Sequence, residues 1–168
     1  MCSSDLDERP RDARLMIERL SELLKAAFDE MAEREVPLGR ELDLIEAYLG
    51  IEQVRFGDRL HVSIDVPDAL RTAPVPPLLL QPIVENAIKH AVSPRTGPAF
   101  ITIRASTAND RVRIDVCDSG PGFDYATAAR EGHGLELAER RLRTHAPSGT
   151  IHTERRPEGF AVAISFPR

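Results

Sequence analysis

Apolar residues recur at intervals of three and four through the first third of the chain, which is the spacing of an amphipathic helix. One such segment runs from residue 12 to residue 34, and another runs from Leu38 to Phe56, where Gly57 and Asp58 provide a stop signal. The apolar positions of the first segment are Ala13, Met16, Ile17, Leu20, Leu23, Leu24, Ala27 and Met31. We predict two helices. The first packs either on its own domain or against a partner helix in a dimer, and the pattern leaves both open.

The period changes to two after residue 59, which is the pattern of strands with one buried face. Alternation predicts a strand over 60–66, a hairpin over 101–116 that turns at Asn109 and Asp110, and closing strands at 150–155 and 160–166. Helical patterns return at 78–92 and 134–144. Pro82 lies inside the former pattern, where it either kinks the helix or opens a new one in its first turn.

The predicted order of elements is α-α-β-α-β-β-loop-α-β-β, with strands that are mostly joined as antiparallel hairpins. Helices that cover one face of such a sheet form a two-layer α/β sandwich of the α+β class. The first residues, 1–11, are polar and lack a period, so we expect them to be disordered. The chain then divides into this segment, a helical segment over 12–36 and one domain over 37–168.

Composition narrows the class of protein. The chain has 168 residues, 42% of them apolar and 29% charged, which is typical of one soluble globular domain. No apolar run reaches the length of a membrane span, and no signal segment opens the chain. A net charge of −5 argues against a nucleic-acid surface, and the two cysteines, Cys2 and Cys117, fit a reducing compartment. We expect a cytoplasmic protein that binds no nucleic acid.

Three polar clusters are candidates for chemistry. In the first, Asn86, Lys89 and His90 share one face of a predicted helix whose other face is apolar. An amide oxygen is a suitable hard ligand for Mg²⁺, and a lysine three residues later can meet phosphate oxygens. The alternative is an ordinary amphipathic helix with a solvated polar face.

The second cluster is Asp118-Ser119-Gly120-Pro121-Gly122, directly after a predicted strand. Its carboxylate can accept from an exocyclic amine, and its glycines let the backbone approach a flat ring; the alternative is a simple turn. The third is Gly132-His133-Gly134-Leu135, which opens a helix. Its backbone N–H groups can face an anion, although such a glycine pair also often marks only a turn.

The order of these clusters resembles the ATP-binding module shared by sensor histidine kinases, gyrase, Hsp90 and MutL. Four longer segments are more specific: VPLGRELDLIEAYLGIEQVRFGDRL, VPPLLLQPIVENAIKH, DSGPG and GHGLELAERRL. Together they resemble the C-terminal part of LytS-type sensor histidine kinases over residues 13–167. The resemblance implies a Bergerat-type ATP-binding fold that binds ATP with Mg²⁺.

The resemblance also implies roles for individual residues. Asn86 would hold Mg²⁺, Asp118 would bind the adenine amino group, and Gly120 and Gly122 would shape the adenine pocket. Residues 123–131 would form a short lid over ATP. The segment containing Gly132, Gly134 and Leu135 would face the phosphates, with Lys89 and His90 near them.

Residues 12–36 would be part of a dimerisation hairpin, which implies a homodimer and a response regulator as partner. The family's phosphoacceptor histidine lies upstream of this point in a characteristic segment. None of the five histidines here has that context, so we expect no phosphoacceptor in this chain. Any membrane anchor would lie in an upstream region of the full-length protein.

Two positions depart from the pattern of the histidine kinases, and a third bears on the choice between a kinase and an ATPase. Leu137 replaces an asparagine of many relatives, and Phe160 replaces a threonine near adenine, which would weaken nucleotide binding. The ATPases and anti-sigma-factor serine kinases place a general-base glutamate where Pro82 stands, and proline cannot accept a proton. This favours a histidine kinase, whose acceptor imidazole needs little activation. A non-catalytic nucleotide-binding or dimerisation module is the alternative.

Overall fold

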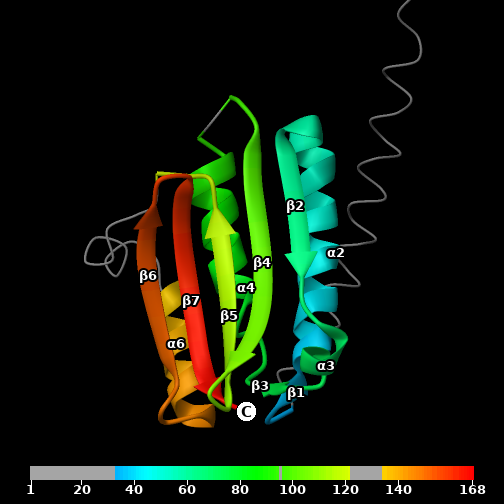
Figure 1. Ribbon diagram of the computed structural model, residues 1–168. Coiled ribbons are helices and arrows are strands. Elements are labelled where there is room, and N and C mark those ends of the chain that lie inside the picture. The colour runs from blue at the N-terminus through cyan, green and yellow to red at the C-terminus, as the bar shows by residue number, and fades with distance from the viewer. Residues whose placement is uncertain (1–32, 95, 122–133) are drawn as a thin grey trace, which may run out of the picture.

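A five-stranded sheet and a layer of helices form the described part of the chain, which comprises residues 33–94, 96–121 and 134–168 of a computed structural model (Figure 1). The predictions for residues 1–11, for the helix that begins at residue 12 and for the lid at 123–131 lie outside these residues. No helix within the described ranges is both long and apolar enough to cross a membrane.

In chain order the elements are β1 (Val36–Pro37), α2 (Leu38–Phe56), the 3₁₀ turn η1 (Gly57–Arg59), β2 (Leu60–Asp65), α3 (Asp68–Arg71), β3 (Pro74–Val75), α4 (Gln81–Ala87), the π-helical turn η2 (Ile88–Val92), β4 (Ala99–Ala108), β5 (Arg111–Asp118), α6 (Gly134–His145), β6 (Thr150–Arg156) and β7 (Gly159–Pro167). From α2 onward the longer elements follow the predicted order, and β1, α3 and β3 are short additions to it.

The large sheet has the strand order β2-β4-β5-β7-β6. Three of its pairs are antiparallel, as predicted, while β2 and β4 run parallel. A parallel pair needs a crossover, which is here the segment containing α3 and α4. Asn109 and Asp110 join β4 to β5 with φ values of 52° and 56°, the left-handed conformation of a tight hairpin turn.

The hydrophobic core lies between the sheet and the helices. Successive residues of a strand point to opposite faces of the sheet, so that β5 buries Val112, Ile114 and Val116 on the face that meets the helices. Figure 1 shows α2, α4 and α6 together on one face of the sheet. This arrangement confirms the predicted two-layer α/β sandwich with a mostly antiparallel sheet.

Short elements with no detectable period differ from the prediction. Val36, assigned from the sequence to the N-terminal helical segment, lies in β1 instead; it pairs with Val75 of β3 and is 1% exposed. A ribbon of two residues per strand is too short to show alternation. The predicted helix over 78–92 begins at Gln81, with Pro82 in its first turn, and its last part is a π-helical turn.

Candidate functional site

Helix α4 and the π-helical turn after it carry the first predicted cluster. Their apolar side is buried against the core through Ile83, Val84, Ala87, Ile88, Ala91 and Val92. Asn86 and His90 are partly exposed and Lys89 is exposed, so the polar face is turned away from the core as predicted. The turn closes with a bond from the Ser93 N–H to the Ile88 carbonyl. Such turns are frequent at functional sites.

The N-terminus of α6 lies against the first turns of α4. A Cβ on Gly134 would be 3.3 Å from the Cβ of Pro82 and 3.4 Å from Nδ2 of Asn86. The amide of Asn86 therefore lies next to the end of α6 where backbone N–H groups lack helical partners. Leu135 follows Gly134, but its side chain is 5% exposed and belongs to the core.

The turn after β5 rests on the other end of the same helical segment. Oδ1 of Asp118 accepts from the Gly120 N–H at 2.8 Å, and the Ser119 N–H donates to the Phe100 carbonyl at 3.0 Å. A Cβ on Gly120 would lie 2.8 Å from both Cα and Cβ of Ala91. Only glycine allows Gly120 to lie this close to Ala91. Because Ala91 follows His90 and Gly120 lies two residues after Asp118, the contact brings His90 and Asp118 into one region.

A cavity of about 540 Å³ opens beside this turn. It is lined by His90, Pro94, Ser119, Gly120, Pro121, Arg155, Arg156, Pro157, Glu158 and Gly159. Of the predicted site residues, His90 and Gly120 line it, whereas Asn86, Lys89, Asp118 and Gly134 do not. The volume is within the range of sites for small molecules.

One wall of the cavity is the hairpin between the predicted closing strands, β6 and β7, whose residues 155–159 were not among the predicted site residues. Arg155 donates to the Pro121 carbonyl at 2.9 Å and so ties this hairpin to the turn after Asp118. A Cβ on Gly159 would lie 1.8 Å from the carbonyl oxygen of Asp118. No motif marks these residues, because only strand pairing brings them to Asp118.

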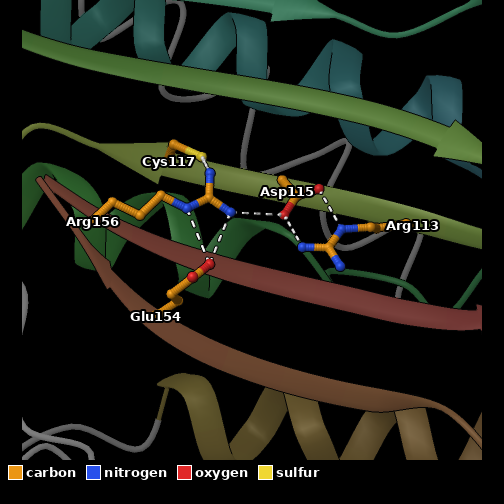
Figure 2. A network of polar contacts seen from close by, with 5 residues as sticks. All are labelled: Arg113, Asp115, Cys117, Glu154 and Arg156. Carbon is orange, nitrogen blue, oxygen red and sulfur yellow. Dashed lines mark hydrogen bonds and ion pairs between the residues drawn. The ribbon is translucent and has the colours of Figure 1, made fainter. Parts of the chain in front are cut away.

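Arg156 of this wall belongs to a polar network on the sheet face opposite the helices (Figure 2). Its guanidinium contacts Glu154 at 3.1 Å, Asp115 at 3.7 Å and the sulfur of Cys117 at 3.4 Å. Asp115 also accepts two bonds from Arg113, at 2.8 and 2.7 Å. Burial raises the pKa of the Cys117 thiol, which keeps it protonated near neutral pH. The network holds Arg156 in a fixed orientation beside the cavity.

Helix α4 offers one side chain, Asn86, that could contribute an oxygen to a magnesium ion brought by a ligand. The described ranges contain no group of three or more His, Cys, Asp or Glu side chains that could hold a metal ion. Asn86 offers one amide oxygen, and the oxygens of a polyphosphate would supply other hard ligands. Gly122, Gly132 and His133 lie outside the described residues.

The structure shows where the three positions singled out by comparison with the family lie, namely Pro82, Phe160 and Leu137. Pro82 is buried against Gly134, and the neighbouring Glu85 is exposed and accepts from Gln81 at 3.0 Å. Phe160 pairs with Asp118 in the ladder between β5 and β7, and its side chain is 4% exposed in the core. Leu137 lines a second cavity, of about 430 Å³, and does not line the first.

Two family models match the chain. One, described as histidine kinase, matches residues 2–60. The other, described as histidine kinase-, DNA gyrase B-, and HSP90-like ATPase, matches residues 77–168, more than half of the chain. The residues between the two matches, 61–76, contain most of β2 together with α3 and β3.

Curated relatives are sensor histidine kinases. The chain is 38% identical over 172 residues to the sensor histidine kinase YpdA of Escherichia coli (strain K12), covering 98% of this chain and 30% of the relative. It is 39% identical over 112 residues to the sensor protein LytS of Oceanobacillus iheyensis, covering 67% of this chain and 19% of the relative. The chain thus spans less than a third of the length of either relative.

Solved structures share the fold. The histidine kinase domain of the blue-light activated histidine kinase EL346 of Erythrobacter litoralis aligns with a TM-score of 0.63 at 22% identity, covering 90% of this chain and 74% of that domain. The catalytic domain of the histidine kinase ThkA aligns with a TM-score of 0.57 at 21% identity, covering 77% and 89%. With motifs, fold and family model in agreement, this chain belongs to the family of histidine kinase-, DNA gyrase B- and HSP90-like ATPases.

Proposed function

We propose that the chain is the ATP-binding part of a two-component sensor histidine kinase, which uses ATP with Mg²⁺ to phosphorylate a histidine on another segment. One observation carries this proposal: a single helical segment meets Gly134 at Asn86 and Gly120 at Ala91. These contacts are five residues apart, roughly 7 Å along a helix axis. The two clusters expected to bind phosphate and adenine therefore share one support.

Each site residue has a proposed task. Asp118 binds the adenine amino group, while Gly120 and Gly122 admit the ring. Asn86 holds Mg²⁺, which when bound neutralises phosphate charge. Lys89 and His90 lie on the same helical face and attract the phosphates, together with the segment containing Gly132, Gly134 and Leu135.

The reaction proposed is phosphoryl transfer to an imidazole. The bond between the γ-phosphorus and the bridging oxygen breaks, a phosphorus–nitrogen bond forms, ADP leaves, and the imidazole releases its N–H proton to solvent. Pro82 supports a histidine kinase over an ATPase or a serine kinase, because no carboxylate stands one turn before Asn86 to act as a general base. Glu85 is adjacent to Asn86 in sequence and lies about 100° away from it round the helix, so it is poorly placed to take that role.

We propose a response regulator as the partner that receives the phosphoryl group. A structure of ThkA in complex with the response regulator TrrA aligns over 90% of this chain with a TM-score of 0.59 at 18% identity. We propose further that the full protein is a homodimer, formed through the helix predicted over 12–36, and that a membrane anchor belongs to its upstream region.

Mixing the chain with ATP, Mg²⁺ and a separate acceptor hairpin of a LytS-type kinase tests the proposal. We expect acid-labile, base-stable phosphate on the hairpin.

Asn86→Ala should abolish transfer and remove the Mg²⁺-dependent part of ATP affinity measured by calorimetry. Glu85→Gln, one residue away and exposed, is the matched control and should retain transfer. Binding without transfer would instead favour a non-catalytic nucleotide-binding module, and equal ATP affinity with Mg²⁺ and with chelator would contradict the role of Asn86.

A further inference from the structure

Glu41 is the one buried charged residue in the described part of the chain, and the proposed reaction does not use it. It lies on α2 and is 1% exposed. One carboxylate oxygen accepts from the N–H of Leu78, and the other accepts from the N–H of Leu80 at 2.9 Å. A buried carboxylate is costly unless such bonds compensate it. The position of Glu41 therefore depends on the turn at residues 78–80.

Leu78 is held in an unfavourable backbone conformation by two helices. Its φ is +55°, a left-handed value that is unfavourable for an L-residue with a side chain. Glu41 of α2 binds its N–H, and Nη1 of Arg141 on α6 donates to its carbonyl at 2.5 Å. Burial lowers the pKa of Arg141, and the nearby charge of Glu41 opposes this. Strained residues held from several sides are frequent where geometry serves function.

The same turn begins helix α4. The carbonyl of Leu80 accepts from the N–H groups of Ile83 and Val84, both at 3.0 Å, and Leu80 is fully buried. Asn86 follows one to two turns later. Arg141 stands seven residues after Gly134 and so lies on nearly the same face of α6. Helix α6 is thus linked through Arg141 to the turn before α4, and its first residue, Gly134, packs against Asn86 of α4 itself.

We propose that Glu41 is a positioning residue for the nucleotide site. By holding the 78–80 turn, it sets the alignment of Asn86 with the first turn of α6. Glu41 lies in the region matched by the histidine kinase model, and its partners lie in the region matched by the ATPase model. Helix α2 therefore contributes to metal-dependent binding of the nucleotide without touching it. The nucleotide part of this inference rests on the proposed function.

Glu41→Gln tests the inference because an amide oxygen can accept one of the two N–H bonds but not both. We expect ATP affinity in Mg²⁺ to fall about tenfold, because a shifted turn would move Asn86 out of its alignment with the first turn of α6. ATP affinity measured in chelator should change less than about threefold. Without Mg²⁺ the Asn86 contribution is absent, and the Asp118 turn proposed to bind adenine lies at the other end of the helix. Glu46→Gln, on the exposed side of α2, is the matched control and should bind as the unaltered chain.

A rescue variant separates positioning from general stability. Glycine adopts the backbone conformation of Leu78 without strain, so Leu78→Gly in the Glu41→Gln background should restore most of the Mg²⁺-dependent affinity. Equal losses with Mg²⁺ and with chelator, or no rescue, would overturn the proposal.

Hydrogen exchange distinguishes a failure of this proposal from a failure of the proposed function. Glu41→Gln should speed exchange of the amides of Ile83–Asn86 about tenfold, with β4 and β5 unchanged. Unchanged exchange at Ile83–Asn86 would overturn the positioning role, whether or not the chain binds ATP. If the unaltered chain binds no ATP, the proposed function fails, and accelerated exchange would still support the control of α4 by Glu41.

Discussion

At the scale of single residues, the site depends on places where a side chain is missing. Gly120 lies against Ala91, Gly134 against Asn86, and Gly159 against the carbonyl of Asp118. A Cβ at the first or third of these glycines would come closer than real Cβ atoms do. The motifs DSGPG and GHGL therefore encode close approaches between elements as well as the turns that glycine commonly marks.

Asp118→Asn should weaken ATP binding by about 1.5–3 kcal/mol, the scale of a hydrogen bond to a charged group. An asparagine oxygen can still accept from the Gly120 N–H, so the turn should persist. Calorimetry with ATP and GTP measures the effect. GTP affinity should hardly change, because guanine presents a carbonyl where adenine has its amine. Equal losses for both nucleotides would show that Asp118 only shapes the turn.

Gly120→Ala should lower the free energy of unfolding by about 1–3 kcal/mol, because the added methyl group overlaps Ala91. The displaced turn should also weaken ATP binding. Gly97→Ala is the matched control, since its Cβ would meet nothing within 4 Å. Urea denaturation of both variants gives the comparison, and equal stability of the two would contradict the packing of this turn on Ala91.

At the scale of elements, α2 and α4 are linked through polar as well as apolar contacts. Tyr48 of α2 packs both against the main core and against a small second cluster that contains Leu44 and Ile51. Burial, followed by the charges of Glu52 and Glu85, raises the pKa of Tyr48. Glu85 lies on α4, so a smaller part of this rise in pKa comes from the neighbouring helix.

Tyr48→Phe should make stability less sensitive to alkaline pH. A phenol whose pKa is raised by folding stabilises the protein below its unfolded pKa of about 10, and that stability is lost as pH rises further. Urea denaturation at pH 8 and pH 11 should show a smaller loss in the variant than in the unaltered chain. Cys117, whose pKa burial also raises, contributes to both proteins alike. Identical losses would show that Tyr48 ionises equally in the folded and unfolded states.

At the scale of the whole molecule, the histidines are scattered over the described fold. His61 stacks on Phe100 on β2 and β4, and His152 is exposed on β6. His145 ends α6, where its Nδ1 lies 3.3 Å from the carboxylate of Glu35. The sequence offered no carboxylate beside this histidine, and only folding brings Glu35 to it. His90 alone among these four lines the cavity beside the Asp118 turn, whereas His145 lines the second cavity.

The purified chain should not phosphorylate itself when mixed with labelled ATP and Mg²⁺. His90 belongs to the helix that supports the nucleotide, so in-line attack on the γ-phosphate would require a geometry that a rigid helix can hardly reach. Acid-labile, base-stable label is the readout. Label on the isolated chain would refute the prediction. His133 would then be the first histidine to replace, because it belongs to the segment expected to face the phosphates, and loss of label in His133→Gln would identify it as the acceptor.

The periodic pattern of the sequence determined the large elements and their layers. Helix α2 has the predicted bounds, and the hairpin of β4 and β5 turns at the predicted Asn109 and Asp110. These features follow from local rules, since apolar spacing selects helix or strand and left-handed residues select a tight turn. The polar face with Asn86, Lys89 and His90 was predictable for the same reason, while the roles of those residues remain predictions.

Tertiary structure alone decided how these elements meet. The parallel pairing of β2 with β4, the ribbon of β1 and β3, and the π-helical turn at Ile88–Val92 leave no periodic signal. The cavity wall at Arg155 and the bonds of Glu41 to the turn at Leu78 join residues 34 to 39 positions apart. Local propensity cannot encode such contacts, because they form only when the sheet brings distant segments together and burial requires each polar group to find a partner.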